Sequence, residues 1–131
     1  MERVIDGDTL VTENGERVRL IGVDTPETKH PRKPVQHFGK EAAAFTRRMV
    51  DGKRVRLEFD PANAARAHKD STQQRRTLAY VLLEDGTLLN AEIIKQGYGF
   101  AYIRFPFARM EEFRRLEREA REQGRGLWAL K

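Results

Sequence analysis

Two carboxylates, a hydroxyl and a proline stand together in the stretch Asp24-Thr25-Pro26-Glu27. Pro26 fixes its own φ angle and favours an extended conformation for Thr25, so the two acids are held at a nearly constant separation. Carboxylates placed this close repel each other unless a positive charge lies beside them. Arg19 can supply that charge, and so can a bound metal ion. The stretch therefore predicts a site built around a cation.

A second acidic group comes earlier, at Asp6-Gly7-Asp8. If the backbone is extended here, Asp6 and Asp8 point to the same face of a strand. A plain bulge or turn is the alternative. The Asn-Gly pair within residues 13–16 predicts a hairpin turn, after which residues 17–23 pair back antiparallel. This pairing would bring Asp8 into one sheet with the strand that ends at Asp24.

The remaining elements follow from apolar spacing. Helices with one apolar face are expected at residues 38–51, 91–96 and 108–123, with Asn90 as the N-cap of the second. Further strands are expected at residues 54–59, 77–83 and 98–103. Residues 28–36 and 60–74 have little periodicity and are interpreted as loops. No repeat or second domain is visible, so residues 1–131 are predicted to form a single domain.

Composition limits the function classes. The chain has 131 residues, 25 Lys plus Arg against 20 Asp plus Glu, and a net charge of +5. The excess of positive charge favours an anionic partner such as nucleic acid, although ordinary solubilising charge explains it as well. The chain has no cysteine, which excludes disulfides and thiolate metal sites. It also lacks an apolar run of ~18 residues, so no membrane segment is expected.

The N-terminus has no signal peptide, because Glu2 and Arg3 lead straight into a strand. Such an abrupt start is typical of a trimmed chain. The compartment stays open, and secretion or a periplasmic location after removal of an export signal is one alternative. We expect a monomer.

Several segments together resemble the staphylococcal (micrococcal) nuclease family. These are residues 4–9, residues 19–27 followed by Thr28-Lys29-His30-Pro31, residues 76–80, and Leu127-Trp128. They cover essentially the whole chain in the order of that family. The resemblance implies an α+β fold, mainly β, with a five-stranded OB-type barrel and three helices. It also implies a calcium-dependent phosphodiesterase that cleaves DNA and RNA and leaves 5′-hydroxyl and 3′-phosphate ends.

The resemblance also assigns the metal ligands. Asp8 and Asp24 match the calcium-binding carboxylates, and Thr25 matches the residue whose backbone carbonyl binds the same ion. Asp6 matches a supporting acid near the metal. This donor set makes chemical sense, because calcium takes hard oxygen ligands and tolerates irregular geometry. The three histidines lack metal-motif spacing.

The catalytic residues follow in the same way. Glu27 matches the acid that orients or deprotonates the attacking water. Arg19 and Arg76 match the pair that contacts the scissile phosphate, and guanidinium forks suit phosphate oxygens. Tyr102 matches a tyrosine at the nucleotide pocket, and Lys29 is expected to bind substrate.

The chain departs from the family before Arg76. Relatives usually carry Lys-Tyr-Gly or Arg-Tyr-Gly there, whereas this chain has Gln73-Gln74-Arg75. Arg75 could therefore compete with Arg76 for the catalytic role. We prefer Arg76, because it keeps its spacing to residues 78–80, and we assign Arg75 to substrate binding. With the tyrosine gone, Tyr102 is expected to be the main aromatic residue at the pocket.

Two functions compete at this point. The leading one is a calcium-dependent nuclease acting on DNA and RNA. The alternative is a non-catalytic OB-type module of the same family that only binds nucleic acid. The retention of the acids favours the nuclease, because carboxylates repel phosphate and a pure binder has no use for them.

Overall fold

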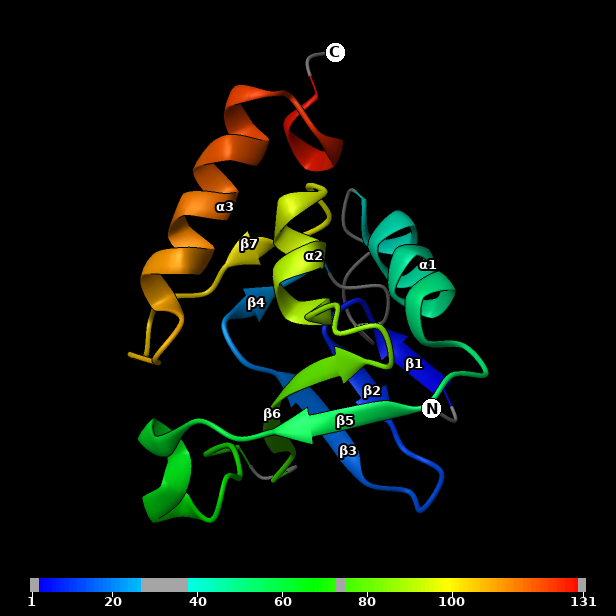
Figure 1. The fold of residues 1–131 in the computed structure, drawn as a ribbon, viewed down its shortest axis with the longest axis vertical. Coiled ribbons are helices and arrows are strands. Elements are labelled where there is room, and N and C mark those ends of the chain that lie inside the picture. Colours follow the sequence, from blue (N-terminus) through cyan, green and yellow to red (C-terminus); the bar gives the residue numbers. More distant parts are fainter. Residues whose placement is uncertain (1–2, 27–37, 73–74, 130–131) are drawn as a thin grey trace.

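The computed structural model describes residues 3–26, 38–72 and 75–129 (Figure 1). Its main sheet has five strands in the order β1-β2-β3-β6-β5. These strands are β1 (Arg3–Asp6), β2 (Thr9–Val11), β3 (Arg17–Leu20), β6 (Thr77–Leu83) and β5 (Val55–Glu58). β3 and β6 pair in parallel, while the other pairs are antiparallel. β6 and β5 agree closely with the strands predicted at 77–83 and 54–59.

The segment Asp6-Gly7-Asp8 forms a turn between β1 and β2, with Asp6 paired to Thr9. The prediction that Asp6 and Asp8 share a face of one extended strand is therefore wrong. The turn is fixed from outside, because the Thr46 hydroxyl donates to the Gly7 carbonyl at 2.8 Å. Any side chain larger than hydrogen at Gly7 would meet Thr25, since a Cβ there would lie 2.9 Å from that side chain.

The strand predicted at residues 17–23 is broken. β3 ends at Leu20, and β4 (Val23–Asp24) leaves the main sheet to pair with β7 (Phe100–Ala101). The break lies at Gly22, whose φ of 73° is in the left-handed region that glycine tolerates best. A Cβ on Gly22 would lie 2.5 Å from the Phe107 ring, so the position also needs glycine for space. The strand predicted at 98–103 shrinks to β7.

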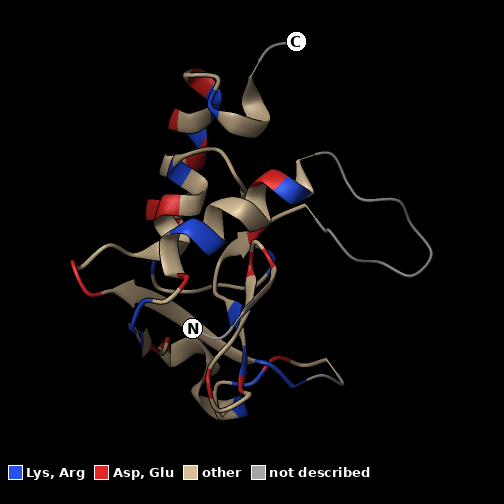
Figure 2. Ribbon diagram, turned by 90° about the vertical axis from the view of Figure 1, so that its right-hand side faces the viewer, with Lys and Arg blue, Asp and Glu red and all other residues tan. Residues whose placement is uncertain are grey.

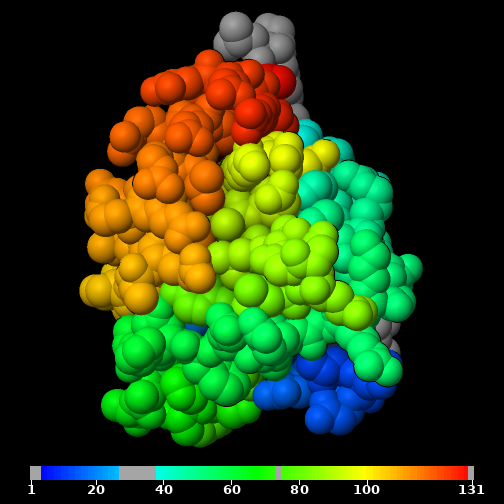
Figure 3. Space-filling model, viewed as in Figure 1, coloured from blue at the N-terminus to red at the C-terminus, as the bar shows by residue number. Residues whose placement is uncertain are grey.

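Three α-helices lie together at one end of the sheet, with α2 (Leu89–Lys95) between α1 (Gly39–Val50) and α3 (Met110–Glu122), as Figures 1 and 3 show. Asn90 is inside α2 and does not cap it. Its buried side chain accepts from the Val81 amide at 2.9 Å and donates to the Ile21 carbonyl at 3.0 Å. The expected cap is therefore wrong, and Asn90 instead joins the helix to β6 and to the turn that follows β3.

The residues from Pro61 to Arg66 form a 3-10 helix, η1, so the loop predicted at 60–74 contains regular structure. Asp60 begins it with a buried carboxylate. That carboxylate accepts hydrogen bonds from the Ala62 amide at 2.9 Å, the Ala108 amide at 2.8 Å and the Tyr80 hydroxyl. Asp60 thereby connects η1, β6 and the segment that enters α3.

The core consists of apolar side chains from both the sheet and the helices. The largest of them is Phe113 of α3, which is fully buried, and Leu10, Leu20, Leu89 and Ile93 are at most 1% exposed. Within the described part of the chain, no helix has the length and apolar character needed to cross a lipid bilayer. The predicted α+β class is confirmed, with five strands in the main sheet and three α-helices, although the sheet is not closed.

The Asp60 cluster predicts an acid-sensitive fold. Burial alone would raise the pKa of Asp60, but the bonds from Tyr80, Ala62 and Ala108 hold it below its usual value of 3.8. A carboxylate with a lowered pKa stabilises the fold above its unfolded-state pKa and loses this effect as the pH falls through its folded-state pKa.

We therefore expect Asp60→Asn to lower the free energy of unfolding by about 2 kcal/mol at pH 7, because one buried donor loses its acceptor. The difference from the parent should shrink below pH 4. Urea unfolding from pH 7 to pH 2.5 measures both quantities. Glu119→Gln, an exposed change on α3, is the control. A pH-independent difference would contradict this role of Asp60.

Candidate active site

Arg19 lies at the centre of the candidate site. It is held in the main sheet, where its partners are Thr9 on β2 and Leu78 on β6. Its side chain is 15% exposed. One terminal nitrogen, Nη1, donates to the carbonyls of Leu20 and Val23 at 2.9 and 2.5 Å. These bonds fix the direction of the guanidinium.

Two carboxylates approach the other terminal nitrogen of Arg19, Nη2. Asp8 Oδ2 lies 3.5 Å from it, and Asp24 Oδ1 lies 3.9 Å from it. Asp8 is largely buried and also accepts from the Thr25 amide at 3.0 Å. Asp24 has half of its side chain in solvent. The structure therefore brings four predicted site residues together, from β3, β4 and the two turns beside them.

Arg76, at the start of β6, is held by Asp70. Its Nε donates to Asp70 Oδ2 at 2.7 Å. Burial alone would raise the pKa of Asp70, but hydrogen bonds from Thr72 and the charged Arg76 hold it below its usual value. The arginine thus has an ionised partner at neutral pH.

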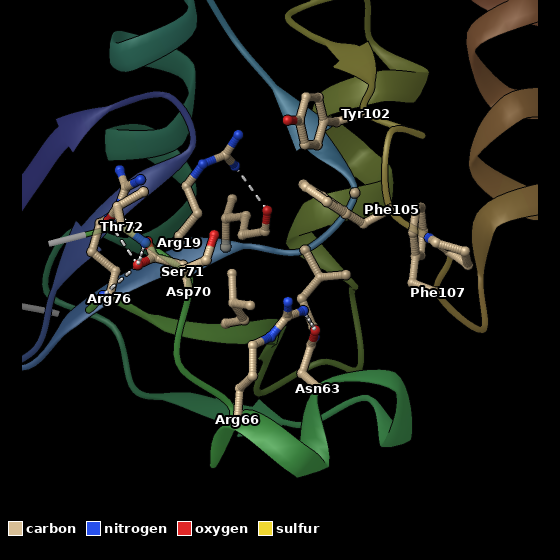
Figure 4. A pocket seen from close by; sticks show the side chains of 15 residues that line it. Arg19, Asn63, Arg66, Asp70, Ser71, Thr72, Arg76, Tyr102, Phe105 and Phe107 are labelled. Carbon is tan, nitrogen blue, oxygen red and sulfur yellow. Dashed lines mark hydrogen bonds and ion pairs between the residues drawn. The ribbon is translucent and has the colours of Figure 1, made fainter. Parts of the chain in front are cut away.

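A pocket of about 210 Å³ joins Arg19 and Arg76 (Figure 4). Its floor contains Leu20, Ile21 and Leu78, and its walls contain Asn63, Arg66, Asp70, Tyr102 and Phe105. Arg75 is exposed and is not among the residues that line the pocket. Only one of the two neighbouring arginines therefore faces the candidate site.

Tyr102 is one of the residues that line the pocket. Its amide donates to the Gly22 carbonyl at 2.9 Å, and its ring centroid lies 5.8 Å from the Arg19 guanidinium carbon. Phe105 accompanies it, with ring centroids 6.4 Å apart. Tyr102 is therefore not the only large aromatic side chain at the mouth of the pocket. Phe105 stands only three positions after Tyr102 in the sequence, and this closeness was the signal that could have predicted a second aromatic residue at the pocket.

The other predicted positions are placed less fully. Glu27 and Lys29 lie outside the described residues. Asp6 ends β1 and is half-buried. Sequence reasoning did not assign Asn63, Arg66 or Asp70 to the site, because the chain before β6 carried no periodic signal.

The fit of a metal ion can be judged from the donor set. Asp8 and Asp24 supply carboxylate oxygens around one nitrogen of Arg19, and Thr25 follows Asp24 directly, with its amide bonded to Asp8. Hard oxygen donors of this kind suit calcium. Among the described residues no three His, Cys, Asp or Glu side chains gather closely enough to hold a metal, so at this site the side-chain donors are two acids. Water and backbone oxygens would have to complete the shell.

Acidic and basic side chains are nearly balanced in number on α3. Figure 2 shows acidic and basic positions interspersed along α3. Ion pairs on that helix join Arg109 to Glu112 and Arg121 to Glu117. With four Arg and five Glu between Met110 and Glu122, α3 therefore offers no surplus of positive charge to an anionic partner.

Comparison with known proteins agrees with this architecture. The family model described as staphylococcal nuclease homologue matches residues 17–130. The thermonuclease of Staphylococcus hyicus is 37% identical over 131 residues, which cover 97% of this chain and 73% of the relative. The thermonuclease of Staphylococcus intermedius is 49% identical over 100 residues, 74% of this chain and 55% of the relative.

Endonuclease YncB of Bacillus subtilis (strain 168) is 35% identical over 134 aligned positions, which cover 98% of this chain and 60% of the relative. The chain thus spans between about half and three quarters of the length of these three relatives. Because the family model covers most of the chain and the similarity to the S. hyicus protein runs almost end to end, the chain belongs to the staphylococcal nuclease family.

Proposed function

We propose that this chain is a nuclease that hydrolyses phosphodiester bonds of DNA and RNA and leaves 5′-hydroxyl and 3′-phosphate ends. The observation that carries the proposal is the pocket between Arg19 and Arg76, with Asp8 and Asp24 at its Arg19 end. The relatives named thermonuclease and endonuclease support the same activity.

The two arginines would bind the scissile phosphate. Arg19 is already oriented by two backbone carbonyls. Arg76 is oriented through its Nε, which donates to the ionised Asp70 carboxylate at 2.7 Å. Guanidiniums preorganised in this way stabilise the charge that builds on phosphate oxygens in the transition state, because they need not reorganise during the reaction.

Calcium is the proposed cofactor, held by Asp8, Asp24 and the carbonyl of Thr25 and assisted by Asp6. When bound, it would act as a Lewis acid that polarises a phosphoryl oxygen. Glu27 is the proposed base that takes a proton from the attacking water. The P–O5′ bond then breaks, and the leaving 5′ oxygen takes a proton from solvent water to become a hydroxyl. Tyr102, Lys29 and Arg75 are proposed to hold the substrate.

A non-catalytic binding module remains the second candidate, because the pocket with its arginines and aromatics would also hold nucleic acid. The nuclease is favoured by the position of Asp8 and Asp24. Two carboxylates beside the phosphate-binding arginine weaken anion binding, and they make sense when they hold a cation.

The metal assignment predicts cleavage of single-stranded DNA in calcium and loss of cleavage in chelator. Magnesium should support it poorly, because this ion demands a tighter octahedron and keeps its waters. Rates on a labelled oligonucleotide in each ion measure this. Equal rates in both ions, or undiminished cleavage in chelator, would contradict the proposed site.

The arginine assignment is tested by two adjacent substitutions. Arg76→Ala should lower kcat by about 10²- to 10³-fold, because it removes a donor to the transition state. Arg75→Ala is the matched control, since its side chain is exposed and outside the pocket. It should affect chiefly the KM. Comparable losses of kcat in the two variants would show that the roles have been misassigned.

The proposed roles of Glu27 and Asp24 predict that one substitution affects turnover and the other affects calcium binding. Glu27→Gln should lower kcat by about 10²- to 10⁴-fold, as expected for a general base, and leave calcium affinity largely intact. Asp24→Ala should weaken calcium binding first. Calorimetric titration with calcium beside steady-state kinetics distinguishes the two. If Glu27→Gln mainly abolished calcium binding, Glu27 would be a ligand.

A further inference from the structure

The pocket continues past the two arginines to residues that the proposed cleavage does not use. These are Asn63 and Arg66 on η1, and Phe105 on the segment after β7. Figure 4 shows Arg66 and Asn63 at the end of the pocket away from Arg19, with Phe105 on the wall between Tyr102 and Phe107. The pocket is thus longer than a single phosphate site requires.

Arg66 is oriented by a buried partner. One of its terminal nitrogens, Nη2, donates to Asn63 Oδ1 at 3.1 Å, and Asn63 is only 8% exposed. Within the described part of the chain, no carboxylate lies within 4 Å of the Arg66 guanidinium. Most arginines this exposed point freely into water, whereas this one is anchored at one nitrogen and keeps its other donors for an anion.

Phe105 offers a base-sized apolar surface in the same pocket. Its side chain is 50% exposed although it lines the pocket. The Arg104 guanidinium carbon lies 5.5 Å from its ring centroid, so positive charge accompanies the ring. Aromatic rings combined with arginine are the usual means of binding single strands, because a base stacks on the ring while a guanidinium neutralises the backbone.

We propose that Asn63, Arg66 and Phe105 form a second nucleotide subsite, in which Phe105 stacks the base and Arg66 binds the phosphate of the nucleotide next to the scissile one. The ligand class is single-stranded nucleic acid, since a base inside a duplex is already stacked and cannot reach Phe105. The inference rests on the proposed function only in placing the scissile phosphate at Arg19 and Arg76.

The test compares ligands of different length. A fluorescently labelled deoxyribonucleoside monophosphate and a labelled single-stranded trinucleotide are titrated with protein in chelator, and anisotropy gives the Kd. Gel electrophoresis after each titration checks that the trinucleotide is intact. The parent should bind the trinucleotide more tightly than the monophosphate, because only the longer ligand reaches the second subsite.

Phe105→Ala and Arg66→Ala should affect different properties of trinucleotide binding. Phe105→Ala should raise the Kd of the trinucleotide about tenfold, the effect of one lost base stack, and leave its salt dependence unchanged. Arg66→Ala should lower the slope of log Kd against log salt by about 0.7, the value for one phosphate contact on a single strand. Both variants should bind the monophosphate like the parent.

Matched controls are available on the same chain. Phe59 is 49% exposed but does not line the pocket, and Arg118 is exposed on α3. Phe59→Ala and Arg118→Ala should leave the Kd and the salt slope of the trinucleotide unchanged. Thermal melting of every variant verifies that the fold persists.

The outcomes separate this proposal from the proposed function. Equal binding of the two ligands by the parent, or equal effects of Phe105→Ala and Phe59→Ala, would overturn the second subsite even if the chain cleaves DNA. Absence of cleavage in calcium, with the predicted binding differences intact, would overturn the nuclease and leave the subsite. Absence of trinucleotide binding by the parent would overturn the second subsite, and the nuclease would still be judged by cleavage in calcium.

Discussion

The candidate site depends on the need to satisfy the charge of one mostly buried arginine. Arg19 is in the middle of the sheet with 15% of its side chain exposed, so its guanidinium has lost most of its hydration. Burying a charge without partners is very costly. The fold meets this need with two carbonyls and two carboxylates, and it places the Tyr102 ring nearby. These partners come from the end of β3, from β4, from the turn after β1 and from the segment after β7.

The break at Gly22 makes that arrangement possible. If residues 17–23 continued as one strand, the Val23 carbonyl would stay in the ladder of the main sheet. Because the chain turns at Gly22, β4 runs beside β7, and the Val23 carbonyl and Asp24 both reach Arg19. The same turn receives the Tyr102 amide. The turn at this one left-handed glycine thus brings Asp24, Arg19 and Tyr102 together.

The sequence predicted those parts of the fold whose signals are local. β6 was predicted with its observed bounds, and α1 and α3 within a few residues, because their apolar spacing is regular. The break at Gly22 was missed because an apolar run looks the same whether or not it changes sheets. Asn90 was misassigned because a polar residue before a helix usually caps it, whereas here its side chain bonds to the Val81 amide on β6 and to the Ile21 carbonyl, 69 positions away in the sequence. Local patterns do not encode such contacts.

The candidate site, like the fold, has a part that the sequence predicted and a part that it did not. The residues carried by family motifs were named from the sequence, and the structure brings Asp8, Arg19, Asp24 and Thr25 together. The segment before β6 had no motif, so its contribution appears only in three dimensions. There η1 begins at Asp60, whose three hydrogen bonds hold it against β6 and the entry to α3. Because Asn63 and Arg66 lie on η1 and Phe105 lies just before Ala108, one buried carboxylate fixes both walls of the outer pocket. The segment before β6 therefore does more than connect two strands, because η1 supplies Asn63 and Arg66 to the lining of the pocket.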